Sequence, residues 1–264
     1  MIMKLLIPAT LAAGVCVPVA FKGGFHEGAG QMRCALLESK LKLSAEQKTA
    51  LHEVFKRHKP GFTTRMEALV QARNAALDAG MDPVVTPEAW RTQQEQVANA
   101  IYEMAKEARS AYLEALPVLT ETQKAEGKAF LKKAHAHMEG MHGRHHEMAL
   151  RFLKHRLDLR DAQVTAIQTV LENHKTALTA KKETLHQAMT AAMEAGMDPA
   201  TSQGVLDQRY GSVKEAGFAM STEVRAAYLE ILPQLTPEQR EAAKGLMVDF
   251  RNAADGVRKL ALGF

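Results

Sequence analysis

The residues best suited to chemistry in this chain are histidines and methionines gathered between positions 135 and 148. Imidazole nitrogen binds Zn, Cu and Ni, and thioether sulfur favours Cu(I). On a helix, His142 and His146 would share one face, but Gly140 and Gly143 favour a mobile chelating segment over a rigid site. The alternative is a polar linker whose histidines have no specific role. The candidate metal ligands are His135, His137, Met138, Met141, His142, His145 and His146.

A second histidine pair, His58 and His174, lies on apolar helix faces at equivalent positions. Two such residues at a twofold axis would be able to share a metal ion. A half-buried histidine with satisfied hydrogen bonds is the more common situation, and we favour it. Methionines elsewhere have helical spacing and are typical of a packed core.

Motifs that would indicate catalysis are missing from the sequence. Residues 146–150 begin like a zinc-protease motif, but Leu150 stands where the second histidine is required. No phosphate-binding loop or nucleophile elbow is present. We therefore expect a protein that is not an enzyme and requires no cofactor, with bound Cu, Zn or Ni as the metal alternative.

The chain contains an internal repeat. With a shift of 116 residues, positions 37–131 align with 153–247 without a gap, and about 36 of 95 positions are identical. This period is longer than the roughly 20–50 residues of solenoid repeats. The pattern predicts two copies of one small domain in tandem, able to pair about a pseudo-twofold axis.

Composition and periodicity predict an all-α fold. Aromatic residues make up only 5% of the chain, and the residues that strands prefer are sparse. Apolar residues recur at alternating steps of three and four along two long stretches of each copy. The first stretch ends at Gly80, and Thr86 and Pro87 begin the next. Each copy is predicted to hold a short, two long and one medium helix, the long ones reaching about 45–54 Å.

The first residues resemble an export signal. Lys4 precedes an apolar run over residues 5–21, with small residues near its end, which is typical of a secretory signal peptide. An uncleaved membrane anchor is the alternative; otherwise we expect no stable membrane insertion once the leader is removed.

The net charge of +4 is too small for a typical nucleic-acid binder. The predicted segments are a signal peptide (1–20), a flexible glycine-rich segment (21–32), repeat 1 (33–134), a His/Met-rich linker (135–148), repeat 2 (149–258) and a tail (259–264).

One pattern, Leu-Ser/Thr-x-x-Gln, occurs three times, at 43–47, 119–123 and 235–239. Its hydroxyl and glutamine form a capping box at a helix start. A fourth copy at 159–163 keeps the leucine and the glutamine but has Arg160 at the cap. One capping box has little specificity, but three at matching places in a repeated helical frame have much more.

This arrangement resembles the Spy/CpxP family of periplasmic proteins, which is named for its LTxxQ motif. The resemblance implies an elongated all-α hairpin unit, present here as two tandem repeats and forming an intramolecular pseudo-dimer. It also implies a periplasmic location and one of several roles. Members of the family act as ATP-independent chaperones, bind or sense metals, or restrain an envelope-stress kinase.

The sequence therefore supports three candidate functions. The first is a chaperone-like stress protein that holds unfolded or amphipathic protein clients on a helical cradle. The second is a heavy-metal binding or resistance protein that uses the 135–148 segment. The third is a helical module with one dedicated partner, such as a sensor kinase.

Overall fold

The computed structural model describes residues 41–140 and 146–262, with side chains described at 41–130, 132 and 151–249. The described residues form helices and turns and contain no strand, which confirms the predicted all-α fold. Among the described helices, none is both long enough and apolar enough to cross a membrane. The predicted signal peptide, the glycine-rich segment and most of the first short helix lie outside the described residues.

The first hairpin consists of α3 (Ala45–Met81) and α4 (Pro87–Ala115). Ser44 and Thr86 cap the two helix starts by accepting from backbone N–H groups three residues on, as expected for N-cap hydroxyls. A single 3-10 turn, η1 (Leu116–Val118), connects α4 to α5 (Glu121–Gly140). Helix α4 begins at the predicted Pro87, and α3 ends one residue beyond the predicted Gly80.

The second hairpin consists of α7 (Asp161–Gly196) and α8 (Gln203–Ile231), preceded by α6 (His146–Arg156). It is followed by η2 (Leu232–Gln234) and α9 (Pro237–Leu262). Helical backbone occupies residues 135–140 and 146–148 of the predicted linker. The alanine and lysine content upstream of Gly140 supports continued helix there.

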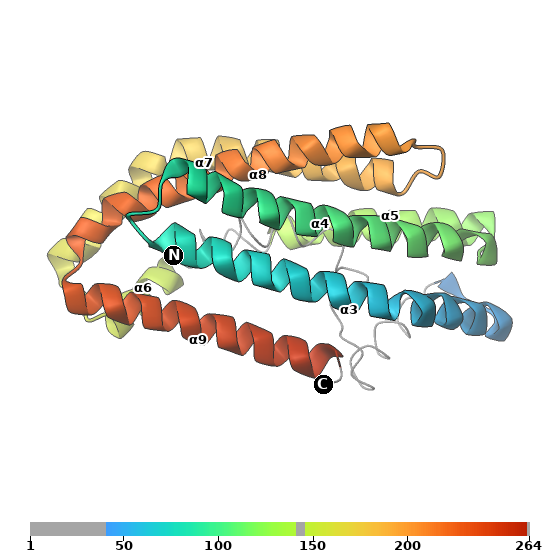
Figure 1. Ribbon diagram of the computed structural model, residues 1–264, viewed down its shortest axis with the longest axis horizontal. Coiled ribbons are helices and arrows are strands. Elements are labelled where there is room, and N and C mark those ends of the chain that lie inside the picture. Colours follow the sequence, from blue (N-terminus) through green and yellow to red (C-terminus); the bar gives the residue numbers. More distant parts are fainter. Residues whose placement is uncertain (1–40, 141–145, 263–264) are drawn as a thin grey trace.

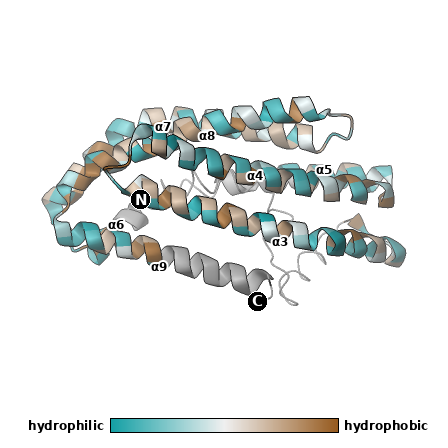
Figure 2. Ribbon diagram, viewed as in Figure 1, coloured by the Kyte–Doolittle hydropathy of each residue, from teal (hydrophilic) through white to brown (hydrophobic). Residues whose placement is uncertain are grey.

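The two hairpins lie side by side in opposite directions (Figure 1). Helix α4 packs against α8, and the α3–α4 and α7–α8 loops lie at opposite ends of the molecule. Helix α9 runs back along α3, so the second half of the chain also covers the first hairpin. Figure 2 shows that apolar residues recur between hydrophilic ones along α3, α4, α7 and α8, which is the pattern of helices buried on one side.

The core is continuous in the second hairpin and divided in the first. One cluster joins buried residues of α7, α8 and α9 and includes Leu77 of α3. The first hairpin has three smaller clusters instead. Arg73 of α3 stands where α7 has the buried Met189, and a long charged side chain cannot continue an apolar core. Leu77 therefore connects the first hairpin to the larger core.

Arg160 leaves one helix start incompletely capped. Gln163 Oε1 accepts from the Arg160 backbone N–H at 3.0 Å, but a guanidinium has no acceptor for the Gln163 N–H. Replacing Arg160 by threonine is expected to raise the free energy of unfolding by about 1 kcal/mol. Urea denaturation followed by circular dichroism measures the change. Ser44→Ala removes the equivalent cap of α3 and should lower stability by a similar amount; an unstable Arg160→Thr variant would contradict this account.

Gly80 gives room to the single tryptophan. A Cβ at Gly80 would lie 2.9 Å from the Trp90 ring, whereas one at the equivalent Gly196 would meet no atom within 4 Å. We expect Gly80→Ala to lower the free energy of unfolding by about 1–3 kcal/mol through overpacking. Gly196→Ala should raise it by about 0.5–1 kcal/mol because alanine favours helix. The same denaturation experiment compares both, and changes of equal sign would contradict the prediction.

Candidate functional site

The glutamines of the repeated motif hold helix starts together. Gln47 Nε2 donates to Gln123 Oε1 at 2.8 Å, and Gln123 Nε2 donates back to Gln47 Oε1 at 3.1 Å. The same amides also donate to the carbonyls of Val118 and Leu41 and accept from the N-cap N–H groups of Ser44 and Thr120. Every polar atom of this largely buried pair is thus hydrogen-bonded.

The second half repeats this glutamine pair. Gln163 Nε2 donates to Gln239 Oε1 at 2.7 Å, and Gln239 Nε2 donates to Gln163 Oε1 at 3.3 Å. Gln239 also donates to the carbonyls of Leu157 and Asp158. Asp158 has a positive φ of 48°, as its equivalent Lys42 has 49°, and this left-handed turn aims the preceding carbonyls at the glutamine. The motif therefore caps helix starts and also joins helices that lie far apart in the sequence.

His58 and His174 each bridge two carboxylates of the neighbouring helix. His58 Nδ1 lies 2.6 Å from Glu107 Oε1, and its Nε2 lies 2.8 Å from Glu114 Oε2. His174 contacts Glu223 and Glu230 at 2.6 and 3.0 Å in the same way. An ionised carboxylate accepts only, so both ring nitrogens must donate, and the imidazolium form fits this geometry. The interpretation of these histidines as hydrogen-bonded packing residues agrees with the structure.

The pKa values follow from this geometry. Burial lowers the pKa of both histidines, but the paired carboxylates outweigh burial, and each net pKa is raised above 6.5. The hydrogen bond from His58 lowers the pKa of Glu114. The hydrogen bond from Lys181, and to a smaller extent that from His174, lowers the pKa of Glu223.

The two carboxylates of each site approach opposite ring nitrogens, so they do not converge on one point. No group of three or more His, Cys, Asp or Glu side chains within the described residues is arranged to hold a metal.

Arg109 of α4 connects the first hairpin to the α7–α8 loop of the second by hydrogen bonds. Its guanidinium donates to four carbonyls at the end of α7 and in the loop that follows, over 2.8–3.2 Å. Tyr112, one turn further, donates to Met197 O at 3.2 Å. A cation at a helix C-terminus is favourable because the exposed carbonyls carry partial negative charge.

The reciprocal contact lies at the opposite end of the molecule. Arg225 of α8 donates to the carbonyls of Asp82 and Val85 in the α3–α4 loop, at 3.2 and 2.8 Å. Tyr228 donates to Met81 O at 3.3 Å, and the Arg225 guanidinium lies 5.5 Å from the centre of the Trp90 ring. Arg225 and Tyr228 follow Arg109 and Tyr112 by 116 residues, so the hairpins exchange equivalent contacts.

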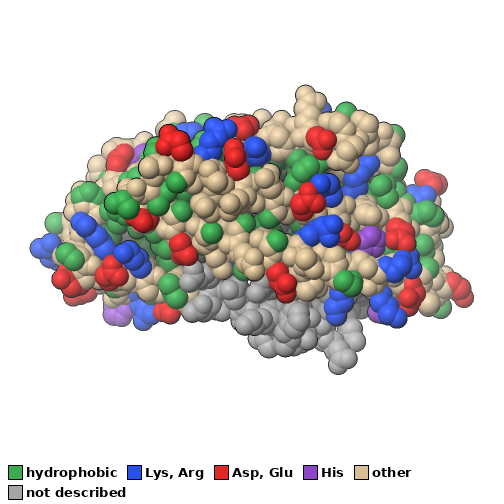
Figure 3. All heavy atoms as spheres, in the orientation of Figure 1, with side chains coloured by type: hydrophobic (Ala, Val, Ile, Leu, Met, Phe, Trp, Pro, Cys, Tyr) green, Lys and Arg blue, Asp and Glu red, His purple; other side chains and the backbone are tan. Residues whose placement is uncertain are grey.

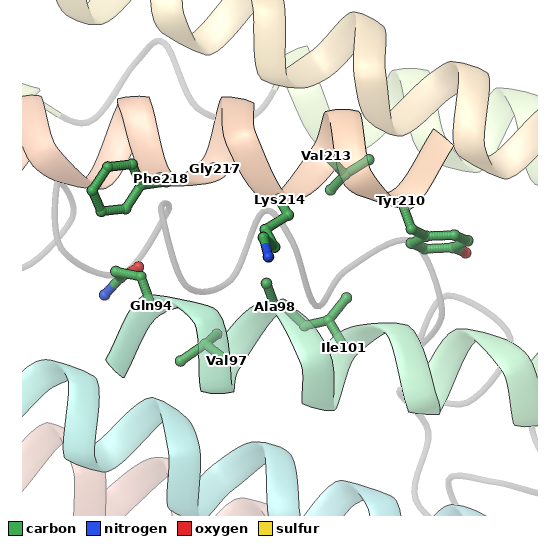
Figure 4. A pocket seen from close by; sticks show the side chains of 9 residues that line it. All are labelled: Gln94, Val97, Ala98, Ile101, Tyr210, Val213, Lys214, Gly217 and Phe218. Atoms are coloured by element: carbon green, nitrogen blue, oxygen red, sulfur yellow. The ribbon is translucent and has the colours of Figure 1, made fainter. Parts of the chain in front are cut away.

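A shallow groove runs between α4 and α8, where the hairpins meet (Figure 4). Its empty space of about 380 Å³ includes open solvent, so it is a surface groove and not a closed cavity. Four lining residues of α4 have lining counterparts in α8 at the 116-residue shift. The lining residues are Gln94, Val97, Ala98 and Ile101 of α4, and Tyr210, Val213, Lys214, Gly217 and Phe218 of α8.

Charged and aromatic side chains border this groove. Arg91 lies over Phe218 at one end, 4.8 Å from the ring centre, and pairs with Glu95 and Glu215. At the other end Tyr102 stacks on Tyr210, with ring centres 4.5 Å apart. Tyr102 also donates to Asp207, and burial followed by this hydrogen bond raises its pKa to about 12. On the face shown in Figure 3, acidic, basic and hydrophobic side chains are intermixed.

The predicted metal ligands are not brought together by described side chains. His135, His137 and Met138 lie in α5, and His146 begins α6, but their side chains lie outside the described residues. Met141, His142 and His145 fall in the undescribed segment between these helices. The predicted metal role of the 135–148 segment stays a prediction.

Residues 145–247 match the family model described as LTXXQ motif family protein. This part of the chain is therefore similar to the LTXXQ motif family. The match contains the motif copies at 159–163 and 235–239, whose glutamines form the second amide pair. LTXXQ motif family proteins are typically periplasmic and of the stress or chaperone type. Neither a curated protein nor a solved structure matches the chain.

Proposed function

We propose that this chain is a periplasmic, ATP-independent chaperone-like protein, without enzymatic activity, that holds unfolded or amphipathic protein segments. The observation that carries the proposal is the α4–α8 groove, with apolar walls and charged borders, in a protein whose second half is an LTXXQ unit. Ala98, Tyr210 and Phe218 are partly exposed in this lining and can contact apolar side chains of a client, while the bordering charges of both signs keep this surface hydrated.

The shallow form of the groove favours weak and reversible holding. A groove open to solvent buries only part of a client segment, so affinity stays limited and release requires no energy source. Both pairs of arginine and tyrosine contacts fix the positions of α4 and α8 from the two ends of the molecule. The binding surface is therefore held in place before a client arrives.

An aggregation experiment tests this function. The purified chain, mixed at near-equal ratio with a chemically unfolded client, is expected to suppress the client's light scattering on dilution from denaturant. No nucleotide should be required. Unchanged scattering across several clients would overturn the proposal.

A pair of glycine substitutions locates the activity. Gly217 lines the groove, and a Cβ there would meet only Leu185 at 4.0 Å, while Gly211 of the same helix meets nothing within 4 Å. Gly217→Glu is expected to remove at least about half of the suppression, because a carboxylate makes the groove wall polar. Gly211→Glu is the matched control and should leave suppression unchanged. Equal suppression by both variants would place client binding elsewhere.

A further inference from the structure

Helix α3 has a proline in its interior, at Pro60, and Gly61 follows it. Proline lacks the N–H that would bond the carbonyl four residues earlier in a helix, and glycine lowers helix stability further. The corresponding residues of α7 are Thr176 and Ala177, which keep the backbone N–H groups. The backbone of α3 is therefore weaker here than α7 is at the same point.

The apolar core of the first hairpin is divided at the same place. Phe55 packs in one cluster and Phe62 in another, so the division falls at Pro60. Their counterparts in α7, Leu171 and Leu178, belong to a single cluster. Apolar packing therefore joins the two parts of α7 but not the two parts of α3.

A carboxylate of α4 spans the break in α3. Glu107 Oε1 lies 2.6 Å from His58 Nδ1, and Glu107 Oε2 lies 2.8 Å from Arg65 Nη1. These two partners lie on opposite sides of Pro60. Gly61 leaves room for the carboxylate, since a Cβ at this position would lie 2.7 Å from the Glu107 carboxylate carbon. Glu107 thus holds both parts of α3 against α4.

We propose that α3 has a hinge at Pro60 and Gly61, and that Glu107 is the latch that keeps this hinge closed. Residues 45–59 leave α4 as a unit when the hinge opens, while the later part of α3 stays packed. Figure 1 shows that the start of α3 (blue) extends beyond the end of α9, so α9 covers only a later part of α3. Opening exposes the apolar cluster around Phe55. The inference goes beyond the proposed function, because it concerns the chain without a client.

The second hairpin has the same latch on a helix without the hinge. Glu223 lies 2.6 Å from His174 and also pairs with Lys181, as Glu107 does with its two partners. The glutamine pairs at the ends of the two hairpins are also alike. The hairpins share these polar contacts and differ at the hinge and in the division of the core. The second hairpin is therefore an internal control for the first.

Hydrogen exchange of the full chain, followed by mass spectrometry of its peptides, tests the hinge. Relative to the rates of an unfolded chain, residues 45–59 are expected to exchange about tenfold faster than residues 161–175, because they open locally. Pro60→Thr introduces the residue of the second half and should slow the exchange of 45–59 by about tenfold. Pro60→Ala should act in the same way. Equal exchange of the two segments in the unaltered chain would overturn the inference.

Glu107→Gln tests the latch. A neutral amide replaces a carboxylate that pairs with two cations, so the exchange of residues 45–59 should rise by about tenfold. Residues 62–81 should change by less than about twofold, because they stay packed when the hinge opens. Circular dichroism at each stage shows that the variant is folded.

Glu223→Gln is the matched control for the latch. Because α7 is continuous, its exchange should rise evenly over residues 161–175 and 178–196. An even rise along the whole of α3 in Glu107→Gln would show a general loss of stability and would overturn the hinge. Unchanged exchange of residues 45–59 in that variant would overturn the latch. Neither result depends on aggregation suppression, so the hinge and the proposed function fail or stand separately.

Discussion

Replacing Arg109 by methionine is expected to lower the free energy of unfolding by about 2–4 kcal/mol. The substitution keeps a long apolar stem but removes four charge-assisted hydrogen bonds to carbonyls around the end of α7. Such bonds contribute about 1.5–3 kcal/mol each and are not additive. Urea denaturation followed by far-ultraviolet circular dichroism measures the loss.

Arg209→Met is the matched control for this prediction. Arg209 is an exposed residue of α8, and its substitution should change stability by no more than about 0.5 kcal/mol. Arg225→Met extends the test to the other end of the molecule, where the guanidinium lies over the only tryptophan, Trp90. Its loss should change the tryptophan emission of the folded protein, which Arg109→Met should leave unaltered. If Arg109→Met behaved as Arg209→Met does, the contact between the hairpins would have no energetic role.

Stability is expected to fall as the pH rises from about 6 to 9. The folded-state pKa values of His58 and His174 lie above the ordinary 6.5. Their contribution to the free energy of unfolding is therefore complete below pH 6.5 and is lost as the pH rises through the folded-state pKa values. The pKa values of Glu114 and Glu223 are lowered, so these carboxylates remain ionised at pH 6. Denaturation at a series of pH values measures the slope.

The variant with His58→Gln and His174→Gln supplies the comparison. Glutamine retains a neutral donor but does not titrate, so the pH profile between 6 and 9 should become flatter. At pH 6 each substitution is expected to cost about 1–2 kcal/mol, since a neutral amide donor replaces the imidazolium that pairs with two carboxylates, for His58 those of Glu114 and the half-buried Glu107. A profile with the same slope as that of the unaltered protein would show that other groups control the pH dependence.

The helices were predictable because their signals are local. Thr86 and Pro87 mark the start of α4, and the periodic apolar residues before Gly80 mark the length of α3, which ends one residue later at Met81. The capping role of Gln47 was also predictable, since its partner is three residues away. Its pairing with Gln123 was not, because that contact joins residues 76 apart and depends on how the helices pack.

The contacts between the hairpins were harder to predict. An arginine on a long helix normally indicates a solvated face, so Arg109 gave no distinct signal. A signal was nevertheless present, because Arg109 and Tyr112 are both unchanged at the 116-residue shift, within one of the most similar stretches of the repeat. The groove residues Gln94 and Lys214 differ from their counterparts Tyr210 and Ala98, so only the structure revealed that they lie together.

The pairing of the two hairpins within one polypeptide has a consequence for how this protein responds to dilution. Two separate subunits joined by equivalent loop contacts would dissociate as their concentration fell, whereas a covalent connection keeps the local concentration of each hairpin near the other constant. The unfolding midpoint should therefore not depend on the amount of protein present. A cell could keep such a protein scarce without losing its assembled form.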